Sequence, residues 1–100
     1  MSLTVKVHTK QDRTIVAVCD SSLLGQVLEE NGVRLDLSGD FYNGEVRDRS
    51  EVGDLVRNAD GVNLVGESAV RVGIEEGVID EGHIIKVQGV PHAQAVIVQE

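Results

Sequence analysis

Four polar side chains of this 100-residue chain have types that could support catalysis. Cys19 and Asp20 end an apolar run, Asn63 follows a turn, and His92 follows a proline. A thiolate and a histidine base form a nucleophilic pair, provided that the thiol is exposed and a neighbour lowers its pKa. A free cysteine in an apolar strand is more often a small hydrophobic residue. Two interpretations therefore stay open: one convergent pocket, or separate structural roles.

The segment from Gly61 to Ser68 has the glycine spacing of a phosphate-binding P-loop, but Glu67 stands where the lysine belongs. That substitution reverses the charge that should meet the β and γ phosphates, which excludes a P-loop nucleoside triphosphatase. A glycine turn into a helix remains, and its free N–H groups could hold an anion. Alternatively, Asn63 and Gly66 are turn and cap residues, and Glu67 favours the helix dipole.

The segment Gly89–Gln94 predicts a stiff turn between two apolar strand-like runs. Pro91 restricts the backbone, His92 titrates near neutrality, and Gln94 supplies an amide, so the segment is suited to contact with a ligand. The alternative is that His92 hydrogen-bonds only to backbone. The three histidines are far apart in the sequence and no cysteine pair supports them, so neither a metal site nor a cofactor is predicted.

Phe41 and Tyr42 are the only phenyl or phenol side chains, and they adjoin Asn43 and Gly44 in a predicted loop. Adjacent aromatic residues on a glycine turn can form a stacking platform for nucleic-acid bases. Because neighbouring side chains alternate in direction, the favoured interpretation is that one of them plugs the core.

The chain carries 17 acidic and nine basic residues, a net charge of −8, which on average repels a phosphate backbone. Such acidity is also expected of a protein from a salt-rich cytosol. The bases are not evenly spread, however, because Lys6, His8, Lys10 and Arg13 share a short segment with only one acid, Asp12. This segment is either a solvated strand edge or a rim that faces phosphate.

Length and composition predict one domain over residues 1–100, of which residues 1–3 could include an expression scar. The apolar content of 41% contains only 2% aromatic residues, which indicates a β-prone core built from valine, leucine and isoleucine. No apolar run approaches the roughly 18 residues that span a bilayer, and no secretory signal is present. A single cysteine excludes an internal disulfide. We therefore expect a cytoplasmic protein.

Periodicity and cap residues predict an α+β domain with a mostly antiparallel sheet in the order β-β-α-β-α-α-β-β. The third helix places Gly73 on its inner face, which predicts close packing there. A brief apolar segment at 62–65 is not counted as a strand, and the last two strands are expected to hinge at Pro91. The expected elements are a strand hairpin at 3–8 and 14–19, a short helix at 21–30 ended by Asn31–Gly32, a strand at 33–37, a helix at 48–59 capped by Asp48, a helix at 66–77, and strands at 83–90 and 93–99.

Several motifs in this order resemble the DUF424 family of small, uncharacterised archaeal proteins, over nearly the whole chain. They are Val16–Asp20, Leu23–Gly25, Phe41–Glu45, Ala59, Asn63–Glu67 and Gly89–Gln94. The resemblance implies an archaeal source and a link to RNA binding or translation, and it assigns no catalytic role. It marks as binding positions Cys19, Asp20, Asn63, Gly66, Glu67, Pro91, His92 and Gln94.

Three hypotheses follow. The favoured one is a non-enzymatic binding module that contacts RNA or a translation protein through Lys6, Lys10 and Arg13 and through the turn at Pro91 and His92. The second is a small ligand-binding domain or enzyme with Cys19, Asp20, Asn63 and His92 around one pocket. The third is a protein-interaction domain that offers a sheet edge to a partner or to its own copy.

Overall fold

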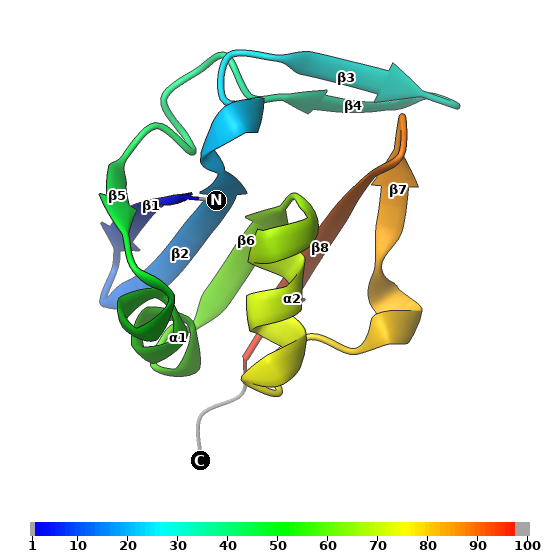
Figure 1. Cartoon of the computed structure of the whole chain (residues 1–100). Helices are drawn as coiled ribbons and strands as arrows, with labels where there is room; N and C mark the ends of the chain where they lie inside the picture. The colour runs from blue at the N-terminus through cyan, green and yellow to red at the C-terminus, as the bar shows by residue number, and fades with distance from the viewer. Residues whose placement is uncertain (1, 98–100) are drawn as a thin grey trace.

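The N-terminal hairpin forms the centre of the fold. In the computed structural model, which describes residues 2–97, β1 (Leu3–Lys10) pairs with β2 (Arg13–Asp20) along their whole length (Figure 1). The turn has two residues, Gln11 and Asp12, with φ of 52° and 63°. Positive φ at both positions matches the twist of the flanking strands. The predicted hairpin is confirmed, with a tighter turn than expected.

One sheet of six strands holds most of the chain, in the order β5-β1-β2-β6-β8-β7. The strands added to the hairpin are β5 (Glu45–Arg47), β6 (Gly61–Val65), β7 (Ile85–Val87) and β8 (Val90–Val96). Only β2 and β6 run parallel, so the α+β class and the mostly antiparallel sheet are confirmed. The predicted order omitted β5 and β6. β5 has only three residues, all exposed, and β6 has only five, so neither is long enough to give a clear periodic signal in the sequence.

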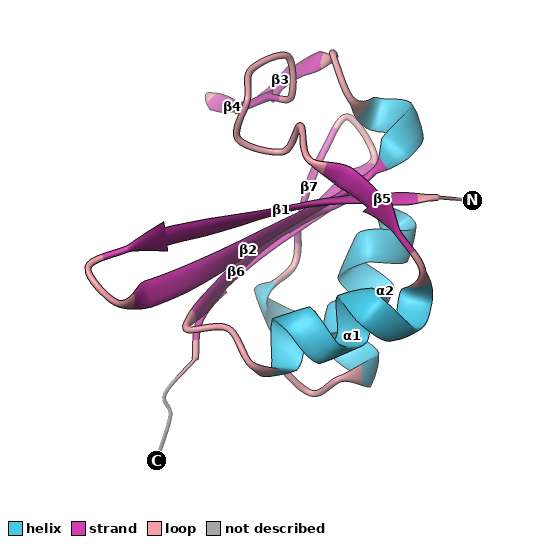
Figure 2. Cartoon of the chain, turned by 90° about the vertical axis from the view of Figure 1, so that its left-hand side faces the viewer, coloured by secondary structure: helices cyan, strands magenta, loops and turns pink. Residues whose placement is uncertain are grey.

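Two helices pack on one face of this sheet, as Figure 2 shows. They are α1 (Arg49–Arg57) and α2 (Glu67–Glu75), both predicted from the sequence. Asp48 caps α1 by accepting a hydrogen bond from the backbone N–H of Glu51 at 2.8 Å. A Cβ on Gly73 would lie 2.4 Å from Cδ1 of Leu64, which confirms the predicted close packing of α2 on the sheet.

The predicted helix at 21–30 is wrong. Ser21–Leu23 forms a short 3-10 turn, and Val27–Glu30 is a strand, β3, that pairs with β4 (Val33–Asp36). Asn31 and Gly32, expected to end the helix, form the hairpin turn with φ of 51° and 84°. An Asn-Gly pair suits both structures because both require positive φ. Tertiary packing decides between them, since alternate residues of the hairpin reach the second core.

That second core lies on the sheet face opposite the helices, at the end where the β3–β4 hairpin lies across it (Figure 2). The first core lies between the sheet and the helices, and includes Val16, Val18 and Leu64. Consecutive residues of β2 from Val16 to Cys19 supply the two cores in turn, so this half of the strand is covered on both faces. The second core consists of Ala17, Cys19, Leu28, Leu35, Leu37, Tyr42, Val65 and Val87.

The predicted hinge at Pro91 is also wrong. A short 3-10 turn (Glu81–His83) precedes β7, the chain turns at Gln88 and Gly89, and Pro91 lies inside β8. A strand tolerates this proline because β6 has ended opposite it. The Pro91 carbonyl accepts from the Gly66 N–H at 2.9 Å, while the Gly66 carbonyl already accepts from Val70 in α2. The expected strand at 93–99 ends at Val96, and its residues 98–99, like Met1, lie outside the described residues.

The described part of the chain contains no helix that is both long enough and apolar enough to cross a membrane.

Candidate nucleic-acid interface

The sheet face opposite the helices is covered by the β3–β4 hairpin and its loop at one end only. We call the remainder of this face the open face. Cross-strand register shows which side chains share it, because paired residues project to the same side of a sheet. The open face consists of Lys6, His8, Lys10, Arg13, Ile15, Val46, Asn63, Ile85, His92, Gln94 and Val96.

No acidic side chain occupies this face among the strand positions that the structure describes. The chain as a whole has nearly twice as many acids as bases. In β1 the positions that face away from the helices hold Thr4, Lys6, His8 and Lys10, and Arg13 stands opposite Lys10. All three residues predicted to contact nucleic acid therefore lie on one face.

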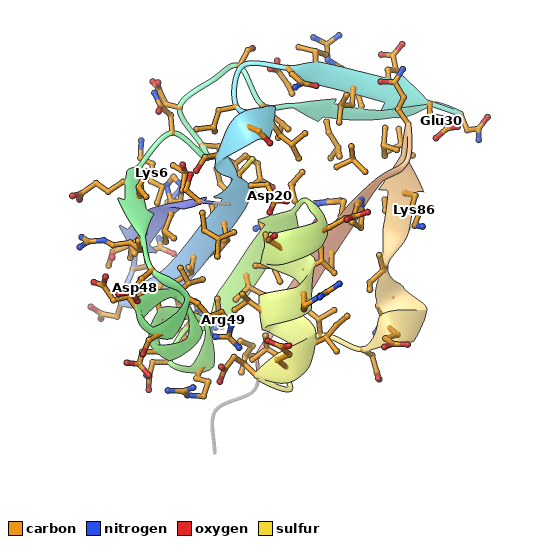
Figure 3. All side chains as sticks on the ribbon, in the orientation of Figure 1. Lys6, Asp20, Glu30, Asp48, Arg49 and Lys86 are labelled. Atoms are coloured by element: carbon orange, nitrogen blue, oxygen red, sulfur yellow. The ribbon has the colours of Figure 1, made fainter. Side chains whose placement is uncertain are left out.

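Lys6 and His8 are held in place by the loop that follows β4. The Lys6 ammonium donates to the backbone carbonyl of Asp40 at 3.0 Å, and Nε2 of His8 lies 2.8 Å from the carbonyl of Phe41. Figure 3 shows Lys6 beside this loop. Neither Lys6, Lys10 nor Arg13 forms an ion pair with any carboxylate that the structure describes. Their charges are therefore not cancelled locally.

The two aromatic residues take opposite roles, as the alternation predicted. Tyr42 is buried in the second core, and burial raises the pKa of its phenol. Phe41 is 42% exposed and stacks on the His8 ring, with centroids 4.5 Å apart and planes inclined by 15°. Phe41 also contacts the edge of Tyr42 at 5.0 Å. The open face therefore has a fixed aromatic surface beside its cations.

The β6–β8 side of the open face carries uncharged polar side chains beside the exposed apolar residues Ile85 and Val96. Lys6, Ala17, Asn63 and Gln94 form one row across four strands, since each is the register partner of the next. Neither the Asn63 amide nor the Gln94 amide hydrogen-bonds to another described residue. His92 is half-buried, and Nδ1 of its ring lies 3.1 Å from the Leu64 carbonyl. Desolvation lowers the pKa of His92, and the bond to Leu64 partly opposes that shift.

Cys19 does not form a nucleophile–base pair with His92. Val65 stands between them in the sheet, as the register partner of both. Two strand spacings separate the backbones by about 10 Å. The thiol is fully buried and donates to the Asp20 carbonyl at 3.3 Å, and desolvation raises its pKa to about 12. Cys19 is a core residue, and the prediction of a pocket shared by Cys19 and His92 is wrong in this respect.

Asp20 occupies the position where the glycine turn could have held an anion. Its buried carboxylate accepts from the backbone N–H groups of Ser68 at 3.2 Å and Ala69 at 2.8 Å, so it caps α2 from a different strand (Figure 3). Gly66 has φ of 109°, and a Cβ there would lie 2.3 Å from Cγ of Asp20. The glycine is required both by the turn and by this approach.

Four of the positions marked by sequence resemblance nevertheless meet. Asp20, Gly66, Glu67 and Pro91 line a shallow hollow of about 200 Å³ beside the first turn of α2. Asn63, His92 and Gln94 instead lie on the open face, and Cys19 lies in the second core. The eight positions thus divide among a helix cap, the open face and the core. No cluster of three or more metal-ligating side chains is present among the described residues.

Sequence reasoning identified the cations, but it did not identify the face that they share with Asn63 and Gln94. A signal was present in part, because Lys6, His8 and Lys10 alternate with Val5 and Val7. It also missed Ile15, which is 38% exposed beside His8. An isoleucine in a continuous apolar run gives no sign that its side of the sheet is uncovered.

Comparison with known proteins places the chain in a family. A family model described as "Protein of unknown function (DUF424)" matches residues 8–98. A solved structure with the same fold is the crystal structure of an uncharacterized conserved protein from Methanopyrus kandleri, with a TM-score of 0.84 and 28% sequence identity over 100% of this chain and 96% of the other. None of the curated proteins matches this chain. The chain therefore belongs to the DUF424 family.

Proposed function

We propose that this domain is a non-enzymatic binding module that takes RNA on the open face. The observation that carries the proposal is the absence of acidic side chains from the described strand positions of that face, in a chain of net charge −8. A nucleic-acid backbone is attracted by cations whose charge is not already neutralised. Lys6, Lys10 and Arg13 meet this condition at one end of the face.

Three of the arginines outside the open face are used differently. Arg47, Arg49 and Arg57 all pair with carboxylates on the helix side of the sheet. Those arginines contribute to the packing of the helices and carry little uncompensated charge. Local arrangement, rather than net charge, therefore supports RNA contact on the open face.

The geometry supports binding over the catalytic alternative. The Cys19 thiol is fully buried and separated from His92 by Val65, and the Asp20 carboxylate is engaged by two backbone N–H groups. Nucleophilic catalysis needs an accessible thiolate within hydrogen-bond reach of its base.

The short edge strands favour the open face, rather than an edge of the sheet, as the contact surface. The edges are β5 and β7, with three residues each. Very short edge strands are one of the ways in which natural sheets avoid pairing with further strands.

The test compares two triple variants with the same net charge. Lys6, Lys10 and Arg13 are replaced by alanine in one, and the exposed Arg34, Arg71 and Lys86, which lie off the open face, in the other. Affinity for a mixed pool of structured RNA is measured by fluorescence anisotropy over a range of salt concentrations. Wild type and control should show the same salt dependence. The open-face triple should lower the slope of log affinity against log salt by about 2, for three lost contacts to unpaired RNA. The proposal is wrong if wild type does not bind, or if both triples weaken binding equally.

A further inference from the structure

The open face has two unlike halves, and their difference bears on the kind of RNA that would fit. The β1–β2 half carries Lys6, Lys10 and Arg13, whereas the β6–β8 half carries Asn63, His92 and Gln94. The first half can therefore attract phosphates. The second can offer hydrogen bonds from uncharged groups, and each amide both donates and accepts.

A fixed aromatic surface stands beside the cationic half. Phe41 stacks on His8 and is itself supported by the edge of Tyr42, so its orientation is set before any ligand arrives. A hydrogen bond from the His8 ring to the Phe41 carbonyl, at 2.8 Å, holds the pair together. Aromatic rings beside a cationic track are the surface on which unpaired bases stack, whatever their identity.

The middle of the face is apolar. Ala17, between Lys6 and Asn63, is fully buried in the second core. In the neighbouring row Ile15 is 38% exposed beside His8, and a Cβ on Gly61 would lie 3.7 Å from Cγ1 of Ile15, so the exposed surface between the two halves is the Ile15 side chain. Three strand spacings separate β1 from β8 by about 14 Å. A nucleotide that leaves its phosphate beside β1 and β2 can direct its base across Ile15 toward Asn63 and Gln94.

A duplex fits this arrangement poorly. Its base faces are stacked internally and cannot reach Phe41, and its two backbones call for cations on both sides of the contact. The open face provides cations on the β1–β2 side alone. Sequence-tolerant contact to unpaired RNA, by contrast, combines one basic track with a stacking surface.

We infer that the open face is a site for unpaired RNA nucleotides, with the backbone along the β1–β2 hairpin, a base on Phe41 and base edges at Asn63 and Gln94. The inference rests on the proposed function and narrows its substrate class.

The experiment measures affinity by fluorescence anisotropy for a short mixed-sequence RNA, first as a single strand and then annealed to its complement. The test variant is Phe41→Leu, which keeps an apolar side chain but removes the stacking ring. The matched control is Val27→Ala, at a residue that is 46% exposed on the β3–β4 hairpin and off the open face. Amide NMR spectra confirm that both variants are folded.

The single strand should bind at least about tenfold more tightly than the duplex. Phe41→Leu should weaken single-strand binding by about 5- to 150-fold, the range for one lost base stack, and Val27→Ala should not. Asn63→Ala and Gln94→Ala should each cost a few-fold. Equal or tighter binding of the duplex, or an unchanged affinity in Phe41→Leu, would overturn this inference while leaving RNA binding itself intact. If neither form binds wild type, the proposed function fails and this inference with it.

Discussion

The two faces of the sheet differ in how their cations are paired: arginines that join the two helices form ion pairs with carboxylates, and the cations of the open face do not. On the helix side, Arg49 contacts Glu75 and Glu76 at 3.0 Å each, and Arg57 pairs with Glu76 and Asp54. Hydrogen bonds from Arg57 and then Arg49 lower the pKa of Glu76. On the open face, Lys6, Lys10 and Arg13 have no carboxylate partner among the described residues.

This contrast shows that net charge is a poor guide to what the protein contacts. Acidic residues of the helix side link the two helices through arginine, and the strands exclude acids from the other side. The helix side should therefore be sensitive to substitution through stability, and the open face through binding. Three predictions test that division.

The largest expected difference comes from neighbouring residues of β2. Val16 is 1% exposed in the first core, whereas Ile15 is 38% exposed on the open face. Val16→Ala should lower the free energy of unfolding by about 2–3 kcal/mol because it leaves a cavity in a packed core. Ile15→Ala should cost less than about 1 kcal/mol, since the side chain is only partly removed from water. Urea denaturation measures both.

The two variants of β2 serve as controls for each other, because they differ mainly in the face to which the side chain projects. Equal losses of stability would show that the open face is as tightly packed as the helix side. That outcome would contradict the expectation that substitutions affect stability on the helix side and binding on the open face.

A smaller effect is expected at the helix caps. Asp20→Ala leaves the N–H groups of Ser68 and Ala69 without their carboxylate in a buried setting, and should cost about 2 kcal/mol. Asp48→Ala removes an exposed cap of α1, with one N–H bond from Glu51, and should cost about 1 kcal/mol.

For a domain of this size, each kcal/mol corresponds to a shift in the thermal midpoint of about 4–8 °C. Thermal unfolding followed by circular dichroism therefore resolves the two caps. A loss in Asp20→Ala no greater than that in Asp48→Ala would mean that the cap from β2 is not a main support of α2.

The smallest effect is a pH dependence on the open face. Desolvation lowers the pKa of His92 in the folded state, so folding favours its neutral form. The contribution of neutral His92 to the free energy of unfolding is fully present above the pKa of about 6.5 that histidine has in the unfolded chain. It is lost as the pH falls through the lower pKa of the folded state. Between about pH 8 and pH 5, wild type should therefore lose more stability than His92→Gln, by less than about 1 kcal/mol.

His83→Gln is the matched control, because His83 is exposed and lies in the 3-10 turn before β7, outside the sheet. It should keep the pH dependence of wild type in urea denaturation. If His92→Gln shows the same dependence as wild type, the half-buried ring does not govern it.

Much of the fold could be predicted from local pattern. The alternation in β1, the cap at Asp48 and the inward Gly73 of α2 are all confirmed, because each depends on neighbours in the sequence. The errors lie where one local pattern suits two structures. Asn31–Gly32 fits a helix end and a hairpin turn equally, and Pro91 lies within a strand only because β6 stops opposite it.

The candidate site, like the fold, could be predicted from the sequence only in part. Its residue types could be predicted, since Lys6, Lys10, Arg13, His92 and Gln94 were all singled out from composition and motif alone. Their grouping could not. Register across β1, β2, β6 and β8 joins positions up to almost ninety residues apart, and it assigned Cys19 and Asp20, equally prominent in the sequence, to the core and to a helix cap.

The sequence by itself therefore determined the class of the domain, its central hairpin and helices, and the supply of cations and amides. Those features follow from hydrophobic period and cap chemistry, which act over a few residues. Only the tertiary structure decided which side of the sheet remains uncovered and which charges meet there. These outcomes depend on strand order and on the position of the β3–β4 hairpin, and both arise from packing between segments that are distant in the chain.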